Sequence, residues 1–254
     1  MAAEQPLCVF VHGWGMNHAI WQPVIEALPS TIECVAVDLP GHGMAAQKTF
    51  DSLDDLVAAL ASDINRPAIW IGWSLGGLAV MQMAAKYPQQ VQAMLLVAST
   101  PCFVKRDDWN YGMPQNLFDG FADELEADYE NTIRRFLTLQ VKDSAQGRQI
   151  LKQIRQRVLQ QPAASVDALR AGLEVLKTTD LRDSLAEVNV PVAISLGEQD
   201  RLVNAVNAEY YRRIFPGADV QCYAHASHAP FLSCLPEFTV QLMRLIKTVE
   251  DAKS

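Results

Sequence analysis

The amino-acid sequence predicts an α/β fold in which a mostly parallel sheet is flanked by helices and interrupted by a helical insertion. Apolar runs of strand length alternate with stretches of helical period over residues 1–101, which is typical of parallel strands joined by crossover helices. The alternation stops over residues 102–179, where the apolar spacing is helical throughout, and resumes over residues 180–254. We therefore expect residues 1–101 and 180–254 to form one core, and residues 102–179 to form a helical cap over the strand ends.

The size and composition of the chain fit one large domain. Its 254 residues are 50% hydrophobic, which suffices for a single core. The longest apolar runs are about strand length, and the N-terminal residues lack the basic and apolar segments of a secretory signal. Five cysteines without CxxC spacing indicate reduced thiols, and the net charge of −8 argues against nucleic acid as a partner. We expect a monomeric cytoplasmic protein that binds neither membrane nor nucleic acid.

Local patterns predict the first elements of the core. Two apolar runs, residues 7–11 and 91–97, are typical of buried strands in a parallel sheet, and residues 34–38 are expected to form another strand. Asn17 has the position of an N-cap before a helix over residues 19–28. Ser52 and Asp55 have capping-box spacing at the start of a second helix, whose apolar face extends to residue 64.

The stretch Gly72-Trp73-Ser74-Leu75-Gly76-Gly77 is the centre of the predicted site. An apolar run precedes it and a helical run follows, so the local structure is strand, sharp turn and helix. Such a turn places Ser74 in an unfavourable backbone conformation, and glycines at 72 and 76 remove clashes because they have no Cβ. This is the context of a nucleophile elbow, in which the serine hydroxyl is exposed at the end of a strand. The alternative is an ordinary turn serine.

A second glycine-rich turn, residues 12–15, follows the first predicted strand. In a serine hydrolase, backbone amides of this turn would face Ser74 and help to bind a tetrahedral oxyanion, together with the amide of Leu75 at a helix N-terminus. Alone, the pattern also fits a plain strand-to-helix turn. The presence of Ser74 favours the oxyanion interpretation.

The last part of the chain returns to strand and helix alternation. The expected elements are strands over residues 190–196 and 219–223, and helices over residues 204–214 and 236–249. Asp200 follows the first of these strands and His228 follows the second. Both are therefore expected at the same edge of the sheet as Ser74.

Ser74, Asp200 and His228 together have the residue types and chain order of a catalytic triad. Serine is a weak nucleophile without an adjacent base, and the base must itself be oriented. We predict that His228 accepts the proton of Ser74, and that Asp200 orients the imidazole. His225 and Glu198 are competitors by proximity, Asp38 precedes the serine in the chain, and His12 is interpreted as structural. No cysteine–histidine cluster has metal spacing, so we expect no metal ion or cofactor.

Charges are segregated within the predicted cap. Residues 107–130 hold eight carboxylates and no lysine or arginine, whereas residues 134–157 hold seven basic residues against one aspartate. Arg148, Lys152 and Arg155 recur at helical spacing and share one face. Such a face is most often simply solvated. The segregation of sign favours the alternative, a docking surface for an acidic partner.

With these residues placed, the chain resembles the α/β-hydrolase superfamily along its whole length. Within it, the resemblance is greatest to the esterases that hydrolyse pimeloyl-acyl carrier protein methyl esters in biotin synthesis. The stretches that carry it lie at both turns, after three other strands and in the cap: residues 12–15, 38–41, 72–78, 98–103, 135–140, 172–178 and 228–231.

This resemblance implies an α/β-hydrolase fold and specific site residues. Trp14 and Leu75 would supply the oxyanion amides, and Ser74 and His228 would contact the substrate beside them. The acyl channel would be lined by Phe136, Leu137, Thr138, Leu139 and Gln140. An acidic acyl carrier protein would dock on basic side chains of the cap, namely Arg135, Arg148, Lys152 and Arg155. Asn131 stands where these esterases have an arginine, and the N-terminal strands of the superfamily are expected to be shortened or missing.

The leading functional hypothesis is a serine carboxylesterase that releases methanol from the methyl ester of a pimeloyl-acyl carrier protein. A broad short-chain esterase or a C–C bond hydrolase would use the same triad. Dehalogenases and epoxide hydrolases of similar fold carry aspartate at the elbow, which disfavours them. A non-catalytic binding module is a further alternative, and the presence of all three triad residues argues against it.

Overall fold

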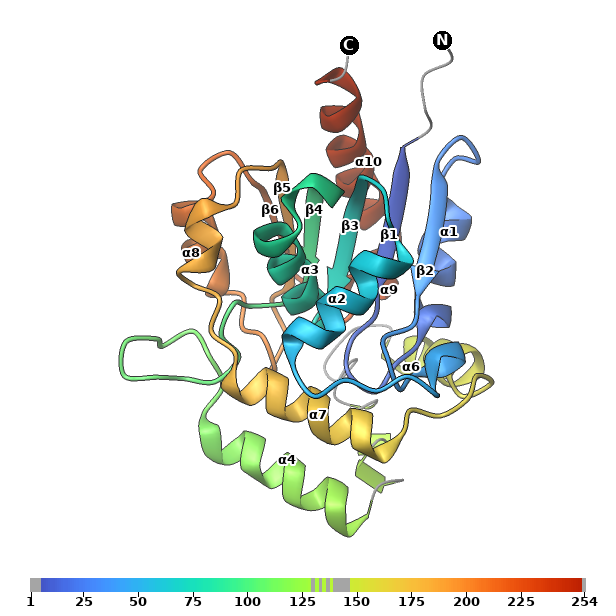
Figure 1. Ribbon diagram of the computed structural model, residues 1–254, viewed down its shortest axis with the longest axis vertical. Helices are drawn as coiled ribbons and strands as arrows, with labels where there is room; N and C mark the ends of the chain where they lie inside the picture. Colours follow the sequence, from blue (N-terminus) through green and yellow to red (C-terminus); the bar gives the residue numbers. More distant parts are fainter. Residues whose placement is uncertain (1–5, 129–130, 133, 136–137, 139–146, 253–254) are drawn as a thin grey trace.

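The computed structural model describes residues 6–128, 131–132, 134–135, 138 and 147–252. Six strands pair in one parallel sheet of order β2-β1-β3-β4-β5-β6. They are β1 Leu7–Val11, β2 Glu33–Val37, β3 Ala68–Trp73, β4 Val91–Val97, β5 Val192–Gly197 and β6 Asp219–Tyr223. Figure 1 shows the strands side by side, with their carboxyl ends toward the bottom of the view. The predicted parallel sheet is confirmed.

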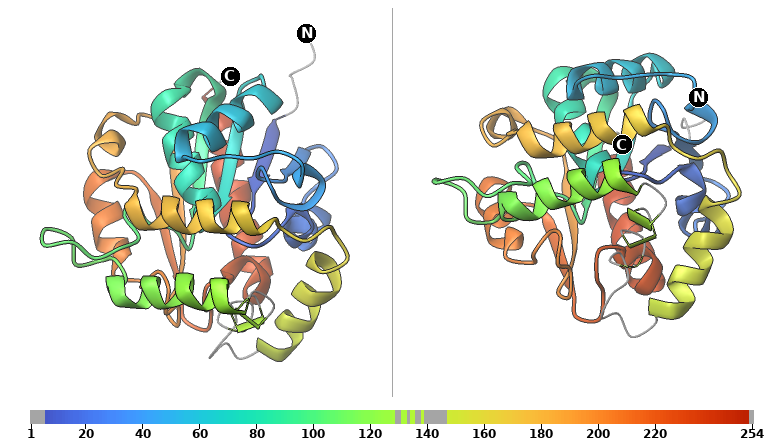
Figure 2. Two further views of the ribbon diagram at one scale, coloured as in Figure 1. Left: turned by 60° about the horizontal axis from the view of Figure 1, so that its bottom comes forward. Right: turned by 90° about the horizontal axis from the view of Figure 1, so that it is seen from below.

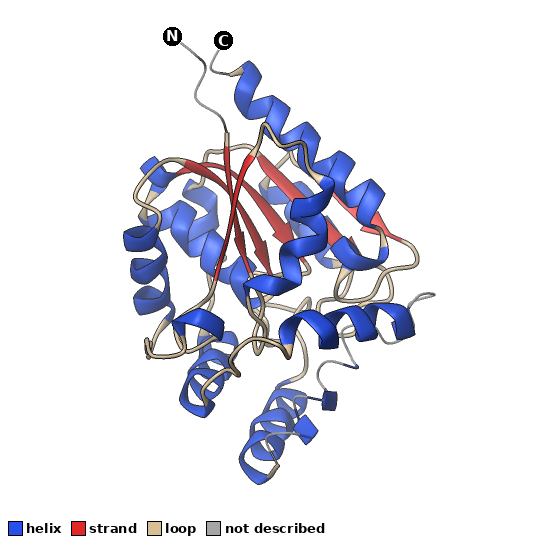
Figure 3. Cartoon of the chain, turned by 90° about the vertical axis from the view of Figure 1, so that its right-hand side faces the viewer, coloured by secondary structure: helices blue, strands red, loops and turns tan. Residues whose placement is uncertain are grey.

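Helices cover both faces of this sheet (Figure 3). One face packs against α2 Leu53–Asp63, α3 Leu75–Lys86 and α8 Asn207–Ile214, and the other against α1 Gln22–Ala27, α9 Pro230–Ser233 and α10 Leu235–Asp251. Each face of the sheet therefore has its own hydrophobic core: the first core lies under α2, α3 and α8, and the second under α1, α9 and α10. Side chains along a strand alternate between the two faces, so Val9 belongs to the first core and Phe10 to the second. Both faces are covered, which explains why the central strands are continuous apolar runs.

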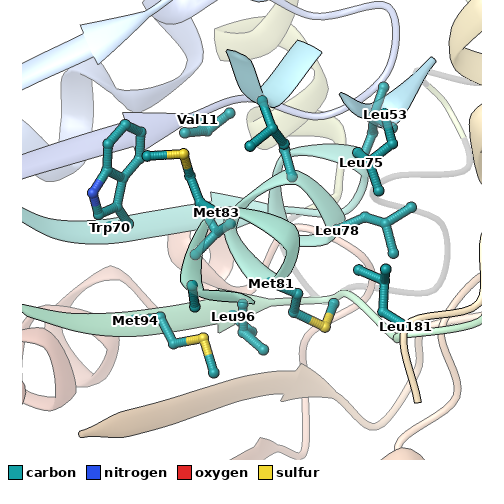
Figure 4. Close-up of a cluster of buried hydrophobic side chains, with 14 of the residues drawn as sticks. Val11, Leu53, Trp70, Leu75, Leu78, Met81, Met83, Met94, Leu96 and Leu181 are labelled. Carbon is teal, nitrogen blue, oxygen red and sulfur yellow. The ribbon is translucent and has the colours of Figure 1, made fainter. Parts of the chain in front are cut away.

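The first core is centred on α3, directly after the predicted elbow. Leu75, Leu78 and Met81 of this helix are fully buried, and Figure 4 shows them among Trp70 and Leu96 of the sheet. Fully burying a large aliphatic side chain contributes about 1.5–3 kcal/mol. This packing holds the helix tightly against the strand that precedes Ser74.

Two predicted helix starts are confirmed by their caps. Ser52 Oγ accepts a hydrogen bond from the Asp55 amide (3.2 Å) and donates one to the Asp55 carboxylate (2.7 Å), which is the expected capping box. Asn17 Oδ1 accepts from the Ala19 amide. The helix expected over residues 19–28 divides into η1 His18–Trp21 and α1, and that expected over 204–214 is shorter, as α8. Pro23 near the start of α1 and the turn at residue 204 account for these boundaries.

We call the segment between β4 and β5 the insertion. Its described helices are α4 Gln115–Ala127, α6 Gly147–Val158 and α7 Val166–Thr178. Figures 1 and 2 show them beyond the carboxyl ends of the strands, with α7 between α4 and the sheet. The expectation of helix throughout residues 102–179 is wrong for residues 103–114. These form a loop closed by bridges between Val104 and Met113 and between Arg106 and Trp109.

None of the helices that the structure describes is both long and apolar enough to cross a membrane. The remaining described elements are short. The short elements are the 3-10 helices η2 Gly43–Ala45, η3 Pro88–Gln90 and η4 Ser184–Glu187.

Candidate active site

The turn between β3 and α3 has the geometry expected of a nucleophile elbow. Ser74 has φ 55° and ψ −116°, an unfavourable region for a residue with a side chain. A Cβ on Gly72 would lie 2.4 Å from the Gly76 carbonyl oxygen, and a Cβ on Gly76 would lie 2.4 Å from that of Val11. Both glycines are therefore required by close backbone approach, as the sequence predicts.

Hydrogen bonds hold the strained turn in place. The Ser74 amide donates to the Val97 carbonyl (2.9 Å), and the Ser74 carbonyl accepts from Ser99 Oγ (2.8 Å) and from two amides of α3. Ser99 follows β4, so the neighbouring strand fixes the turn from the side. These bonds offset the backbone strain. They use only the backbone groups of Ser74, whose side chain lines the pocket described below.

Asp200 and His228 form a buried pair. His228 Nδ1 lies 2.7 Å from Asp200 Oδ2, and the two side chains are 1% and 0% exposed. The other carboxylate oxygen, Oδ1, accepts from the amides of Leu202 (2.7 Å) and Val203 (3.0 Å). With Nδ1–H donated to the carboxylate, Nε2 carries the lone pair. That Nε2 is buried and has no hydrogen-bond partner among the described residues.

Trp73 links this pair to the elbow. Its indole Nε1 donates to the His228 carbonyl (2.7 Å), and its ring lies 5.7 Å from the imidazole between centroids. Trp73 directly precedes Ser74 in the chain, so the loop that carries His228 is bonded to the turn that carries the serine. The structure thus brings the three predicted triad residues to one edge of the sheet.

The competing residues lie elsewhere. His225 and Glu198 are exposed, in contrast to the neighbouring His228 and Asp200. Asp38 accepts hydrogen bonds from the amide and ring of His18 at 2.6 and 2.8 Å and from the Met44 amide at 2.8 Å. It therefore organises the loops after β1 and β2.

His12 is part of the same loop network. Its Nδ1 donates to the Gly13 carbonyl (2.8 Å) and its Nε2 accepts from the Leu39 amide (3.0 Å), which requires the neutral ring. Burial, with a contribution from His42, lowers the pKa of His12 to about 3. Both nitrogens are used in these bonds, in keeping with the structural interpretation. In the described part of the chain, no cluster of three or more His, Cys, Asp or Glu side chains could hold a metal ion.

The glycine-rich turn after β1 lies against Ser74. A Cβ on Gly13 would be 3.3 Å from the Ser74 Cβ, so the backbone of this turn passes directly beside the serine. Leu75 is the first residue of α3, and its amide is one of the four that a helix leaves without an intrahelical partner. Helix N-termini favour negative charge, so Leu75 is well placed to face an oxyanion.

An apolar pocket extends from Ser74 into the insertion. Side chains from the core and from the insertion line it: Trp14, Phe103, Met113, Phe118, Leu173, Leu176 and Leu202. Of these, the sequence identifies only Trp14 as a site residue. The helical stripe of α7 predicts that Leu173 and Leu176 are inward-facing, but no local pattern marks the loop residues Phe103 and Met113.

The predicted acyl-channel stretch is mostly outside the described residues. This holds for Phe136, Leu137, Leu139 and Gln140. Thr138 is described. It is exposed, and its hydroxyl donates to the Arg134 carbonyl (2.9 Å).

The predicted docking residues differ in their surroundings. Arg135 is exposed and pairs with Glu124 (2.7 Å), which already neutralises part of its charge. Lys152 and Arg155 are exposed on α6, and the side chain of Arg148 lies outside the described part. Asn131 donates to the Asp128 carboxylate (2.6 Å). Within the described residues, α6 therefore presents the freer basic surface.

Comparisons with known proteins agree with this geometry. The model of the alpha/beta hydrolase family matches residues 8–242. The pimeloyl-[acyl-carrier protein] methyl ester esterase of Salmonella paratyphi A is 40% identical over 237 residues, covering 93% of this chain and 92% of the relative. That of Nitrosomonas europaea is 38% identical, covering 92% of each.

A solved esterase from Exiguobacterium antarcticum has the same fold, with a TM-score of 0.85 and 20% identity over 95% of this chain and 92% of its own. These matches confirm the resemblance deduced from the sequence, including the expectation of an ester hydrolase. The chain belongs to the alpha/beta hydrolase family, and its relatives within it are pimeloyl-[acyl-carrier protein] methyl ester esterases.

Proposed function

We propose that this protein is a serine carboxylesterase that hydrolyses the methyl ester of a pimeloyl-acyl carrier protein, giving the free acid and methanol. The observation that carries the chemistry is the buried His228–Asp200 pair beside the strained turn of Ser74. The substrate class comes from the names of relatives that match over nine-tenths of the chain.

The arrangement supports a two-step mechanism through an acyl-enzyme. His228 Nε2 removes the proton of Ser74 Oγ as the oxygen attacks the ester carbonyl, and Asp200 stabilises the resulting imidazolium. The amides of Trp14 and Leu75 bind the oxyanion of the tetrahedral intermediate. His228 then protonates the leaving methoxide, which departs as methanol. Water, activated by the same histidine, releases the carboxylic acid and restores Ser74.

The apolar pocket suits a substrate with a methylene chain. Apart from Ser74, its lining is hydrophobic and aromatic, and burial of each CH₂ group contributes about 0.8 kcal/mol. Leu173 and Leu176 come from α7, so the insertion would act as a cap that shapes this pocket. The distal end of such a chain has to leave the site toward a bound carrier protein.

The basic face of α6 is the proposed contact for that carrier. Lys152 and Arg155 are exposed there, and an acidic protein would be attracted to them over a distance of about 10 Å at moderate salt. The docking prediction from the sequence also includes Arg135 and Arg148. The five unpaired cysteines fit a cytoplasmic location, because thiols persist in a reducing compartment.

The test is to supply pimeloyl-acyl carrier protein methyl ester and to measure methanol and free carboxylate. We expect stoichiometric release of both, and none with Ser74→Ala. A short-chain ester, offered at the same concentration, measures the rival activity of a broad esterase. A higher kcat/KM for the short ester than for the carrier-bound ester would contradict the assigned substrate. The assignment of a serine esterase mechanism would still stand.

A further inference from the structure

Two buried side chains of the loop after β1 are hydrogen-bonded to the insertion. Trp14 Nε1 donates to the Leu169 carbonyl of α7 (2.8 Å), and Asn17 Nδ2 donates to the Val158 carbonyl at the end of α6 (2.9 Å). The donors and acceptors are 155 and 141 residues apart in the chain. Trp14 is 1% exposed and Asn17 is 3% exposed.

Helix α7 is shaped to accept the Trp14 ring. Gly172 lies in the middle of this helix, where glycine is about 1 kcal/mol less favourable than alanine. A Cβ at position 172 would lie 2.7 Å from Cδ1 of the Trp14 indole. The missing side chain therefore lets the indole lie close to the helix while its Nε1 reaches the Leu169 carbonyl.

Asn17 uses both ends of its amide. Its Oδ1 accepts from the Ala19 amide and caps η1, while its Nδ2 reaches Val158. Two further bonds make the loop compact: the Met16 amide donates to the Gly13 carbonyl (3.2 Å), and the His18 amide donates to Asp38 (2.6 Å). A displacement at Asn17 would therefore be transmitted to the turn that holds Gly13 and Trp14.

We propose that Asn17 and the indole of Trp14 are positioning groups that fix the oxyanion turn to the insertion. They act through backbone carbonyls of α6 and α7 and set where the Trp14 amide lies relative to Ser74. This inference rests on the proposed function in one respect, the assignment of the Trp14 amide to the oxyanion. It adds that α6 and α7 hold the oxyanion turn in place, besides the contribution of α7 to the substrate pocket.

A change in turn position should appear in kcat rather than in KM. Oxyanion donors act on charge that develops in the transition state, and the loss of one costs about 10²–10³-fold in kcat. Misplacing the donor by loosening its support should cost less, about tenfold. A small soluble ester isolates this effect, because it does not depend on carrier docking.

The test compares Asn17→Asp with Ser52→Ala. Asn17→Asp keeps the size and the oxygen that caps η1, but it replaces the donor to Val158 by a carboxylate oxygen. Ser52→Ala removes the capping hydrogen bond of α2, outside the loop of Asn17, and controls for the loss of one polar contact elsewhere in the chain. A fluorophosphonate titration of Ser74 gives the concentration of competent protein, to which each kcat is normalised.

We expect normalised kcat on the small ester to fall about tenfold in Asn17→Asp, with KM within twofold, and to stay at the parent value in Ser52→Ala. Trp14→Phe replaces the indole by a smaller phenyl ring and loses Nε1–H, so its normalised kcat should fall at least as much. The double variant should fall by less than the product of the two effects, because both act on one loop.

Parent-like normalised kcat in Asn17→Asp would overturn the inference, and so would equal losses in Asn17→Asp and Ser52→Ala. If Asn17→Asp does not fold, Asn17→Ser carries the same comparison, since serine can cap η1 but is too short to reach Val158. An inactive parent protein would contradict the proposed function instead.

Discussion

The strand-end turns of the core and the helices of the insertion contribute to the site in different ways. Ser74, Asp200 and His228 are 5%, 4% and 1% exposed, and each is held by hydrogen bonds to backbone or to a neighbouring triad residue. The basic side chains at positions 135, 152 and 155 are exposed. Under the proposed function, bond-making would be confined to a buried edge of the sheet, whereas recognition of a carrier would fall to a solvated surface. If this separation holds, the two regions respond differently to the same kinds of mutation.

The largest expected effect is at the elbow. Ser74→Ala should lower kcat on both small and carrier-bound esters by about four to six orders of magnitude, because no other group can form the acyl-enzyme. The melting temperature should remain close to that of the parent. Steady-state kinetics with each ester and a thermal melt provide the measurement, and near-parent turnover of either ester would refute the assignment of Ser74.

The two histidines after β6 offer a matched pair. His228→Ala should cost nearly as much as Ser74→Ala, since triad members act as a unit, while His225→Ala should leave kcat within about twofold. Asp200→Asn keeps the side-chain shape but favours the wrong tautomer of His228, with an expected loss of about 10⁴-fold. The three variants are compared on one soluble ester, with fluorophosphonate labelling of Ser74 as the second readout. A larger loss in His225→Ala than in His228→Ala would reverse the choice of base.

Replacing a glycine by alanine should have opposite effects on the free energy of unfolding in the two regions. In Gly76→Ala the new Cβ would lie 2.4 Å from the Val11 carbonyl and 2.5 Å from that of His12, so the backbone would have to shift. We expect the free energy of unfolding to fall by at least about 2 kcal/mol. In Gly120→Ala, in the middle of α4, the new Cβ meets nothing within 4 Å, and the better helix propensity should stabilise by about 0.5–1 kcal/mol.

Urea denaturation of both variants measures these changes directly. A stable, active Gly76→Ala protein would show that the elbow tolerates more movement than the close backbone approach indicates. A destabilised Gly120→Ala protein would indicate contacts on α4 that its open surroundings do not suggest.

The chemistry of the site could be predicted from the sequence because its signals are local. Gly72 and Gly76 mark the elbow within five residues, and polar residues after two apolar runs mark Asp200 and His228. The order of parallel strands then brings their carboxyl ends together without any knowledge of distances. The buried contact with Asp200 and the exposure of His225 agree with the choice of histidine made from the sequence.

Contacts between segments far apart in the chain could not be predicted in this way. The loop of residues 103–114 has no regular period, so its helical interpretation was wrong and Phe103 and Met113 were missed as pocket residues. Amphipathic spacing also leaves the edge of a helix face undefined: the adjacent Leu117 and Phe118 both fit one apolar stripe, but Leu117 is 54% exposed and Phe118 is 7% exposed. The bonds of Trp14 and Asn17 to the insertion have no sequence signature, because each joins a side chain to a backbone carbonyl.

The smallest expected effect is on the surface of α6. Lys152→Glu with Arg155→Glu should raise KM for carrier-bound ester severalfold at low salt, because exposed charges act mainly on association. The kcat on a small soluble ester should stay unchanged, since these side chains lie outside the pocket. Arg135→Glu should have a weaker effect, because Arg135 is already paired with Glu124 at 2.7 Å.

Lys247→Glu is the control for this surface and is matched to either single reversal, Lys152→Glu or Arg155→Glu. Lys247 is also exposed, but it lies near the C-terminal end of α10, at the opposite end of the molecule from the insertion (Figure 1). It changes the net charge by the same amount per residue, so it separates local docking from general attraction to an acidic protein. Added salt should imitate the α6 reversal in the parent enzyme, for the carrier-bound ester alone. Equal increases in KM from a single α6 reversal and from Lys247→Glu would show that the carrier responds to overall charge, and would remove α6 as a specific docking face.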